Sequence, residues 1–332
     1  MNLTYSGLPL DRCTNLRKKK SWLAAEFNHD ETLFCIIKDG MSLFDKTHDL
    51  SPLFLNKEQL NTVGVDSSIF LGKRVSESFF AIDYHKLRFS LQEQLDESGQ
   101  WLPLRQTTAT LNGDDAAILA LAKALVHWHN SHQYCGHCGN INVAVEAGHA
   151  RKCTECRNLT FPRTDPAVIM LVERMFSDGI ARCLLGRQAS WPEGVYSTLA
   201  GFVDPGENLE EAVIREVLEE TDIEVKQPRY ITSQPWPFPS SIMLGFVAEA
   251  TSETIDTRQD DLQIAKWFTR EQLANFLTNS SAINTEGQTQ KQKVTKNKSV
   301  EVTGEQQFKM SSRDSISSYL ITAWLNKEIG KY

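Results

Sequence analysis

The 332-residue sequence predicts an α+β protein in which an N-terminal α/β domain, a small cysteine-bearing segment and a second α+β domain follow one another. The chain is more than twice as long as an average domain of about 150 residues. Short runs of branched and aromatic residues alternate with segments that carry apolar residues at helical spacing. Between the two halves lie four cysteines in two close pairs. We therefore expect domains at residues 1–130, 131–163 and 164–332.

The composition is that of an ordinary soluble protein, with 41% hydrophobic and 23% charged residues. A net charge of −7 argues against a general binder of the nucleic-acid backbone. No segment approaches the roughly 20 apolar residues that span a bilayer, and no secretion signal is evident, so we expect no membrane partner and a reducing, cytoplasmic location. The basic residues between Arg12 and Lys20 leave an organellar targeting signal as an alternative. The final Ile-Gly-Lys-Tyr is not a peroxisomal signal.

The first 130 residues contain strand-like and helix-like segments. Strands are expected at Leu33–Lys38 and Ser78–Ile82, and a helix at Asp114–Asn130. The three histidines between residues 127 and 132 fit an ordinary helix end better than a set of metal ligands. This half of the sequence shows no catalytic pattern.

After residue 165 the pattern is two strands, a helix, a strand pair and a helix near Arg270–Leu277. Residues 278–307 are rich in Ser, Thr, Asn, Gln and Lys and carry almost no large apolar groups, which predicts a disordered insertion. Its lysines leave an RNA contact as the alternative to a solvated loop. A final amphipathic helix is expected at Asp314–Ile329, with Ile316, Leu320 and Trp324 at intervals of four.

Two cysteine pairs with the spacing C-x2-C lie fourteen residues apart; they are Cys135, Cys138, Cys153 and Cys156. Four thiolates surround one zinc tetrahedrally and leave no position for a reacting water. The spacing therefore predicts one structural zinc ion. Unrelated buried thiols and a redox role are the alternatives, and zinc ribbons that bind nucleic acid supply a rival function.

An acidic helix is predicted within residues 201–223, with Asn208 as its N-cap. At about 100° per residue, Glu216, Glu219 and Glu220 fall on one face, beside an apolar stripe that should pack on a sheet. Like charges at this spacing repel, and divalent magnesium or manganese would offset the repulsion. Arg215 and Glu207 are placed to form a supporting ion pair. The alternative is a solvated acidic helix face.

This segment, residues 201–223, resembles the Nudix box, a sequence motif that begins with a glycine and ends with an aliphatic residue. The matching residues are Gly201, Glu207, Arg215, Glu216, Val217, Glu219, Glu220 and Ile223. Asp222 stands where the box has glycine, a position that ends the helix in a left-handed conformation, which Asp tolerates better than most residues.

Residues 233–241, SQPWPFPSS, resemble the array that marks the NADH pyrophosphatase branch of Nudix hydrolases. The likeness extends to the Leu-Asp-Arg motif at residues 10–12, the zinc ribbon and the strand entry at residues 162–169. The resemblance implies a Nudix fold, with a mixed sheet between helices. The prolines around Trp236 and Phe238 predict that these rings lie outside regular structure on a presented surface.

The resemblance implies hydrolysis of NAD(H) to nicotinamide mononucleotide and AMP, and also removal of NAD caps from RNA. Two or three magnesium or manganese ions would be held by Glu216, Glu219 and Glu220, and Arg215 joins the catalytic set. Asp261 stands where relatives carry a further metal-linked glutamate. Gly201 and Glu207 are expected to give structural support.

Four residues are expected to contact the substrate by resemblance: Phe161, Phe202, Trp236 and Ser241. Phe161 replaces a tyrosine that contacts the nicotinamide end in relatives, and it keeps the stacking face without the hydroxyl. A homodimer with a shared site is also implied. A Nudix hydrolase of another compound, such as ADP-ribose or a dinucleoside polyphosphate, and a non-catalytic nucleic-acid-binding protein are the alternatives.

Overall fold

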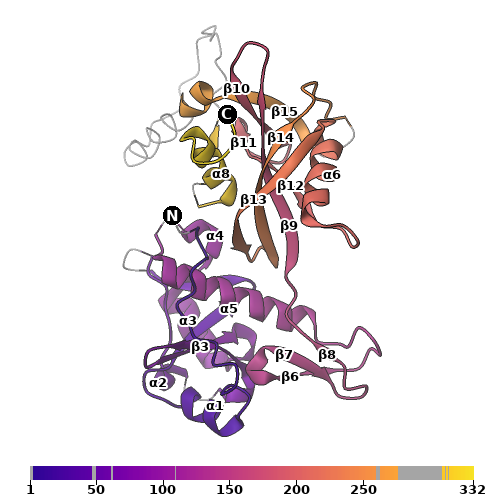
Figure 1. The fold of residues 1–332 in the computed structure, drawn as a ribbon. Helices are drawn as coiled ribbons and strands as arrows, with labels where there is room; N and C mark the ends of the chain where they lie inside the picture. The colour runs from indigo at the N-terminus through magenta and orange to yellow at the C-terminus, as the bar shows by residue number, and fades with distance from the viewer. Residues whose placement is uncertain are drawn as a thin grey trace, which may run out of the picture. The chain divides into compact units, whose positions relative to one another are not determined.

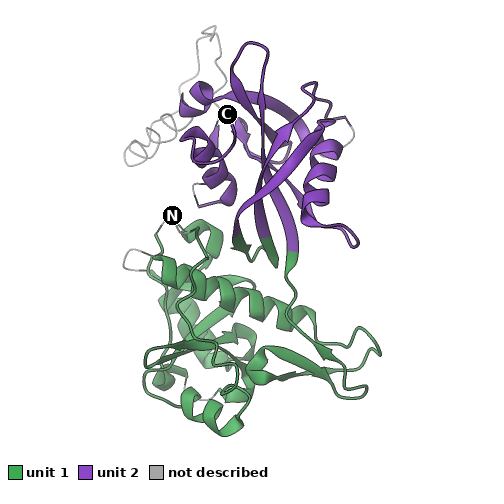
Figure 2. Cartoon of the chain, in the orientation of Figure 1, with its two compact units in different colours: residues 1–165, 234–242 green, residues 166–233, 243–332 purple. Residues whose placement is uncertain are grey.

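The computed structural model describes residues 3–46, 50–60, 63–108, 110–258, 262–275, 309–310, 312 and 314–332. The chain divides into two compact units. Unit 1 consists of residues 1–165 and 234–242, and unit 2 consists of residues 166–233 and 243–332 (Figure 2). The predicted insertion at residues 278–307 and the expected metal ligand Asp261 lie outside the described residues.

Unit 1 is built on a five-stranded sheet with the order β3-β4-β1-β2-β5. Its strands are β1 (Leu33–Lys38), β2 (Met41–Asp45), β3 (Ser68–Arg74), β4 (Glu77–Asp83) and β5 (Gly99–Pro103). Its helices are α1 (Lys20–Phe27), α2 (Lys57–Leu60), α3 (Phe89–Ser98), α4 (Leu104–Thr107) and α5 (Gly113–Ser131), with 3-10 turns at Val65–Ser67, Tyr84–Lys86 and Glu146–Gly148.

Both faces of this sheet are buried, which explains the continuous apolar run in β1. Successive strand residues point to opposite faces, so Phe34 and Ile36 enter one core while Cys35 and Ile37 enter the other. Helix α5 covers the face of Cys35 and Ile37 with its own apolar residues, among them Ile118. The strands and the helix expected in this half are therefore confirmed.

A three-stranded antiparallel sheet completes unit 1. It contains β6 (Asn142–Val145), β7 (Ala150–Cys153) and β8 (Leu159–Thr160) in that order. Asn142 is paired with Cys153, and Lys152 is paired with Leu159. Of the second cysteine pair, Cys153 is the last residue of β7 and Cys156 lies on the turn between β7 and β8.

Unit 2 contains most of a six-stranded sheet with the order β13-β14-β9-β10-β15, in which β12 also pairs with β9. The strands are β9 (Asp165–Met175), β10 (Ala181–Gln188), β12 (Leu199–Phe202), β13 (Val225–Trp236), β14 (Ser241–Ala250) and β15 (Leu262–Thr269). Strands β11 (Val195–Tyr196) and β16 (Lys309–Met310) form a separate parallel pair, and the helices are α6 (Leu209–Thr221) and α8 (Ile316–Leu325), with residues 270–275 also helical.

Helices α6 and α8 cover opposite faces of this sheet (Figure 1). Val213 and Val217 of α6 share a core with Val172 of β9. The neighbouring residue of β9, Glu173, points to the other face and accepts a hydrogen bond from the indole N–H of Trp324 in α8 at 2.8 Å. The mixed sheet between helices confirms the expected α+β class.

The last helix is shorter than predicted. It runs over Ile316–Leu325 rather than Asp314–Ile329. The side chain of Ser315 caps its first turn by accepting from the backbone N–H of Ser318. Beyond its end, Lys327 adopts a left-handed backbone conformation with φ 62°, which a helix cannot continue through. In the described part of the chain, no helix is long and apolar enough to cross a membrane.

Candidate active site

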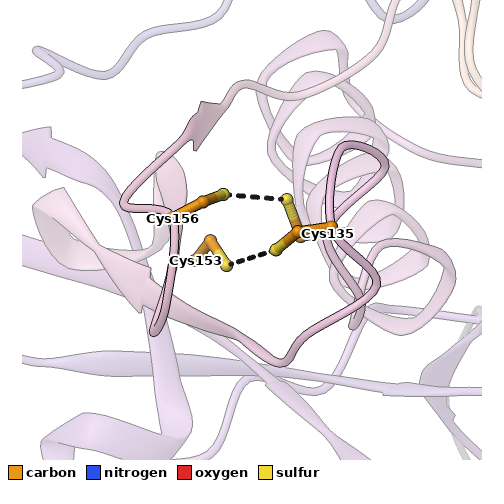
Figure 3. Close-up of side chains that lie close together, drawn as sticks. Cys135, Cys153 and Cys156 are labelled. Carbon is orange, nitrogen blue, oxygen red and sulfur yellow. Dashed lines mark hydrogen bonds between the residues drawn. The ribbon is translucent and has the colours of Figure 1, made fainter.

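The four predicted cysteines come together in unit 1. Their sulfur atoms all lie within 4.8 Å of one another. The Sγ atoms of Cys135 and Cys156 are 3.6 Å apart, and those of Cys138 and Cys153 are 3.4 Å apart (Figure 3). Zinc–sulfur bonds of about 2.3 Å in a tetrahedron place the sulfurs about 3.8 Å apart. The cluster therefore fits one structural zinc ion.

The backbone around the first cysteine pair favours thiolates. The backbone N–H of Asn140, with help from its side chain, lowers the pKa of the Cys138 thiol to about 6. Hydrogen bonds from the backbone N–H groups of Cys138 and His137 also lower the pKa of Cys135. Zinc binds the deprotonated sulfur. The peptide groups of the first knuckle thus prepare the ligands for metal.

The histidines at the end of α5 do not join this cluster. The Nε2–H of His129 donates to the carbonyl oxygen of Gly148 at 2.7 Å, and its Nδ1 accepts from Nη1 of Arg151 at 2.8 Å. Burial lowers the pKa of His129 to about 4, so the ring is neutral at pH 7. His129 therefore ties α5 to the ribbon as a structural residue.

Helix α6 of unit 2 begins at a complete capping box. The side chain of Asn208 accepts from the backbone N–H of Glu211 at 2.9 Å, and the side chain of Glu211 accepts from the backbone N–H of Asn208 at 2.8 Å. The helix ends at Asp222, whose left-handed conformation has φ 58° and ψ 22°. Both ends agree with the sequence prediction.

Arg215 organises the acidic face of α6. It donates from Nε and Nη2 to the two carboxylate oxygens of Glu207, at 2.9 and 2.6 Å. Its Nη1 donates to Oε1 of Glu216 and Oε2 of Glu219, both at 2.9 Å. Its Nη2 also reaches the carbonyl oxygen of Phe202 at 2.9 Å. One guanidinium therefore fixes two glutamates of the helix to the loop before it and to strand β12.

These contacts shift the protonation of both partners. The hydrogen bonds from Arg215, followed by one from the backbone N–H of Asp204, lower the pKa of Glu207 to about 2. The same pairing, with Glu207 the largest contributor, raises the pKa of Arg215 above its ordinary value. Both groups are therefore charged across the physiological range.

Gly201 leaves the space that Glu216 occupies. A Cβ built on Gly201 would overlap Cδ and both carboxylate oxygens of Glu216. Glu220 is buried with 8% of its surface exposed, while the side chain of Glu219 is 55% exposed. The side chain of Glu216 is 13% exposed, so Glu219 is the one of these three acidic groups that reaches the surface.

The donor chemistry of this face fits a divalent cation. Carboxylate oxygens are the ligands that magnesium and manganese prefer. Among the described residues, only the four cysteines already have ligand atoms within 4.8 Å of one another. Glu216 and Glu219 would have to turn from Arg215 toward a shared ion, and the exposed Glu219 has the space to do so.

Three family models match successive parts of the chain. The NADH pyrophosphatase-like rudimentary NUDIX domain matches residues 31–128, the NADH pyrophosphatase zinc ribbon domain matches residues 130–161, and the NUDIX domain matches residues 163–285. Human NAD-capped RNA hydrolase NUDT12 is 32% identical over 322 residues, which cover 82% of this chain and 68% of that protein. The chain belongs to the NADH pyrophosphatase-type Nudix hydrolases.

Two further relatives of this Nudix hydrolase support the assignment. Human mitochondrial NAD(P)H pyrophosphatase NUDT13 is 34% identical over 276 residues, which cover 80% of this chain and 73% of the relative. The NAD-capped RNA hydrolase NudC of Pseudomonas aeruginosa is 40% identical over 184 residues, which cover 55% of this chain and 64% of the relative.

The expected substrate residues of this Nudix hydrolase fall in both units. Phe202 belongs to unit 2 and is 59% exposed at the end of β12. Phe161 belongs to unit 1, is 60% exposed, and lines a hollow of about 570 Å³ together with Tyr134 and His137. Ser241 is the first residue of β14.

The expectation for Trp236 is wrong in one respect. Trp236 is the last residue of β13, although prolines flank it, and its ring is half-buried. Its ring centroid lies 6.4 Å from that of Tyr5 and 5.1 Å from that of Phe238, with the guanidinium of Arg105 5.2 Å away. Proline is tolerated where its missing N–H is not needed by a neighbouring strand. The rings of Trp236 and Phe238 therefore pack against other residues of unit 1 and are not presented on an exposed surface.

No pattern in the sequence indicates the buried hydroxyl pair beside β12. Ser197 Oγ donates to Ser317 Oγ at 2.8 Å, and the two residues are 120 positions apart. Serine in a strand connection and serine in a helix start each have ordinary local explanations. Only the tertiary structure brings them together.

Proposed function

We propose that this Nudix hydrolase splits the pyrophosphate bond of NAD(H), releasing nicotinamide mononucleotide and AMP, and that it also removes NAD caps from RNA. The observation that carries the proposal is the seating of Glu216 against Gly201, within the acidic cluster that Arg215 organises. The proteins named as NAD-capped RNA hydrolase and NAD(P)H pyrophosphatase match across about four fifths of this chain. The activities in their names supply the substrate class.

Glu216, Glu219 and Glu220 would hold two or three magnesium or manganese ions, with Asp261 as a further ligand. Such ions neutralise a diphosphate and lower the pKa of bound water toward 7. Arg215 keeps Glu216 and Glu219 on one face in the absence of metal, and its charge remains close to the site. We assign the orientation of the attacking water to Glu219 or Glu220.

The substrate would be held by the four residues expected from resemblance. Phe202 offers an exposed aromatic face for a base, and Phe161 offers another for the nicotinamide end. Trp236 and Ser241 complete the proposed set. Exposed rings without a hydroxyl give stacking affinity with little discrimination between bases.

A homodimer is part of this proposal. The zinc ribbon exposes a group of large apolar side chains, which are Tyr134, Ile141, Val143, Leu159 and Phe161. We infer that these side chains contribute to an association site, since exposed apolar patches commonly mark one. We further propose domain boundaries at residues 130 and 163, and a cytoplasmic location for the protein.

Purified protein should be incubated with magnesium and with NADH, NAD-capped RNA or ADP-ribose, and the products separated by chromatography. Release of AMP from NADH supports the proposal. Cleavage confined to ADP-ribose or dinucleoside polyphosphates would instead favour a Nudix hydrolase of another substrate. Cleavage of none of these would favour a non-catalytic nucleic-acid-binding protein.

Glu219→Gln removes one carboxylate charge from the acidic face and should lower kcat at least about 100-fold. Glu210→Gln is the matched control, because Glu210 is an exposed glutamate in the first turn of the same helix. Equal activity of the Glu219→Gln variant and the wild type would remove Glu219 from the mechanism.

A further inference from the structure

A buried hydroxyl cluster joins the start of β12 to helix α8. The Oγ atom of Ser317 accepts from the backbone N–H of Thr198 at 3.0 Å and from the hydroxyl of Ser197 at 2.8 Å. Ser197, Thr198 and Ser317 are 9%, 4% and 2% exposed, so water does not replace these bonds. Ser317 thus satisfies one backbone donor and one side-chain donor in the interior of unit 2.

Helix α8 is a firm support for this contact. The side chain of Ser315 caps its first turn, and Ile316 packs against the backbone at Gly245, where a Cβ would lie 2.9 Å from Cδ1 of Ile316. At the other end of the helix, the indole of Trp324 is hydrogen-bonded to the buried Glu173 of β9. The position of Ser317 is therefore fixed at both ends of its helix.

The other end of the connection is the acidic face of α6. Thr198 is three residues before Gly201, a span of about 10 Å in extended chain. Gly201 provides the space for the carboxyl group of Glu216, and the carbonyl oxygen of Phe202 accepts from Arg215. Because β12 is only four residues long, we expect a shift of residues 197–198 to reach both contacts.

Strand pairing holds the start of β12 within the sheet. The ladder to β9 runs from Leu199 to Phe202, and it fixes the strand within the plane of the sheet. Ser197 pairs with Gly186 of β10 through two backbone bonds of 2.9 and 3.0 Å. The hydrogen bonds to Ser317 hold the start of β12 from the α8 side, which is out of the plane of the sheet.

We propose that Ser317 is a positioning residue for the metal-binding glutamates: its hydroxyl fixes the start of β12 and thereby seats Gly201 against Glu216. This inference rests on the proposed function, since it assumes that the glutamates hold divalent metal. It predicts that loss of the hydroxyl weakens metal binding itself, and not only the stability of the fold.

The test is a titration of full-length Ser317→Ala with Mn²⁺, followed by electron paramagnetic resonance of the free ion and, separately, by NADH cleavage. Loss of a supporting hydrogen bond should raise the half-saturating Mn²⁺ concentration about tenfold. The matched control is Ser318→Ala, because Ser318 is the next residue of α8 and is also buried. It should bind Mn²⁺ as the wild type does.

The titration is run under conditions in which circular dichroism shows each variant to be fully folded, because unfolded protein in equilibrium with the native state would raise the apparent midpoint. Under these conditions the midpoint separates positioning from stability. A Ser317→Ala variant with the wild-type midpoint would overturn the proposal, even if its melting temperature fell. If the Ser317→Ala variant does not fold, Ser197→Ala is tested instead, because it keeps the hydrogen bond from the Thr198 N–H. The Ser197→Ala variant should shift the Mn²⁺ midpoint in the same direction by a smaller amount. An unchanged midpoint in this variant would also overturn the proposal.

The two readouts also separate this inference from the proposed function. A wild-type protein that binds Mn²⁺ but cleaves no NADH would refute the proposed substrate and leave the role of Ser317 to be decided by the binding midpoints. A wild-type protein that binds no Mn²⁺ would refute both.

Discussion

Gly201 and the carboxyl group of Glu216 occupy adjoining space that no side chain on residue 201 could share. The Gly201→Ala variant must displace Glu216 or push β12 away from α6. We expect kcat/KM for NADH to fall at least about 100-fold, because small displacements at a reacting centre have large effects on rate. Gly113→Ala is the control, since a Cβ there meets nothing within 4 Å. Retained activity in Gly201→Ala would contradict the close fit.

The ion pair between Glu207 and Arg215 should make stability depend on pH. The pKa of Glu207 is lowered from 4.5 to about 2, so its contribution to the folded state is complete above pH 4.5 and is lost as the pH falls toward 2. Denaturant unfolding of the wild type and Glu207→Gln should therefore differ at neutral pH, and the difference should shrink between pH 4.5 and 2. A difference that grows in acid would show that another group is responsible.

One zinc ion per chain is expected, and it should be needed for the ribbon to fold. Cys153→Ser places a poor ligand at a fully buried position of the cluster and should abolish zinc retention, as measured by atomic absorption after dialysis. Cys35→Ala changes an equally buried thiol outside the cluster and should leave the zinc content unchanged. Stoichiometric zinc in the Cys153→Ser variant would exclude this donor set.

Asp222 ends α6 in the left-handed conformation, with φ 58°. Glycine adopts this conformation without the steric cost that a Cβ brings. Asp222→Gly should therefore raise the free energy of unfolding by about 0.5–1 kcal/mol, and Asp222→Ala should lower it by about 1 kcal/mol. Thermal unfolding of both variants gives the order directly. The opposite order would mean that the Asp222 side chain stabilises this end in another way.

The parts of the molecule that depend on local chemistry were predictable from the sequence. The capping box at Asn208 and the left-handed end at Asp222 involve only neighbouring residues, so the bounds of α6 could be inferred. The spacing of the cysteine pairs likewise predicts their convergence around a metal. The pairing of Arg215 with Glu207 was expected from their places on the helix and on the loop before it, and the structure contains it.

The features that escaped prediction depend on long-range packing. Trp236 ends a strand and packs near Tyr5, a neighbour more than 200 positions away, and the surrounding prolines suggested the opposite. The final helix was predicted too long because its apolar spacing says nothing of the left-handed turn at Lys327. The contact between Ser197 and Ser317 carries no periodic pattern at all.

The path of the chain has a consequence for attempts to isolate its parts. Residues 234–242 group with the N-terminal 165 residues, although they follow most of the C-terminal sheet. A fragment that starts at residue 166 would keep Trp236 and Phe238 but lose Tyr5 and Arg105, the groups that surround these rings. Two large aromatic side chains would then face solvent at the tip of a hairpin. Truncation at residue 166 would therefore yield an aggregation-prone fragment. A soluble fragment would also require polar replacements for Trp236 and Phe238.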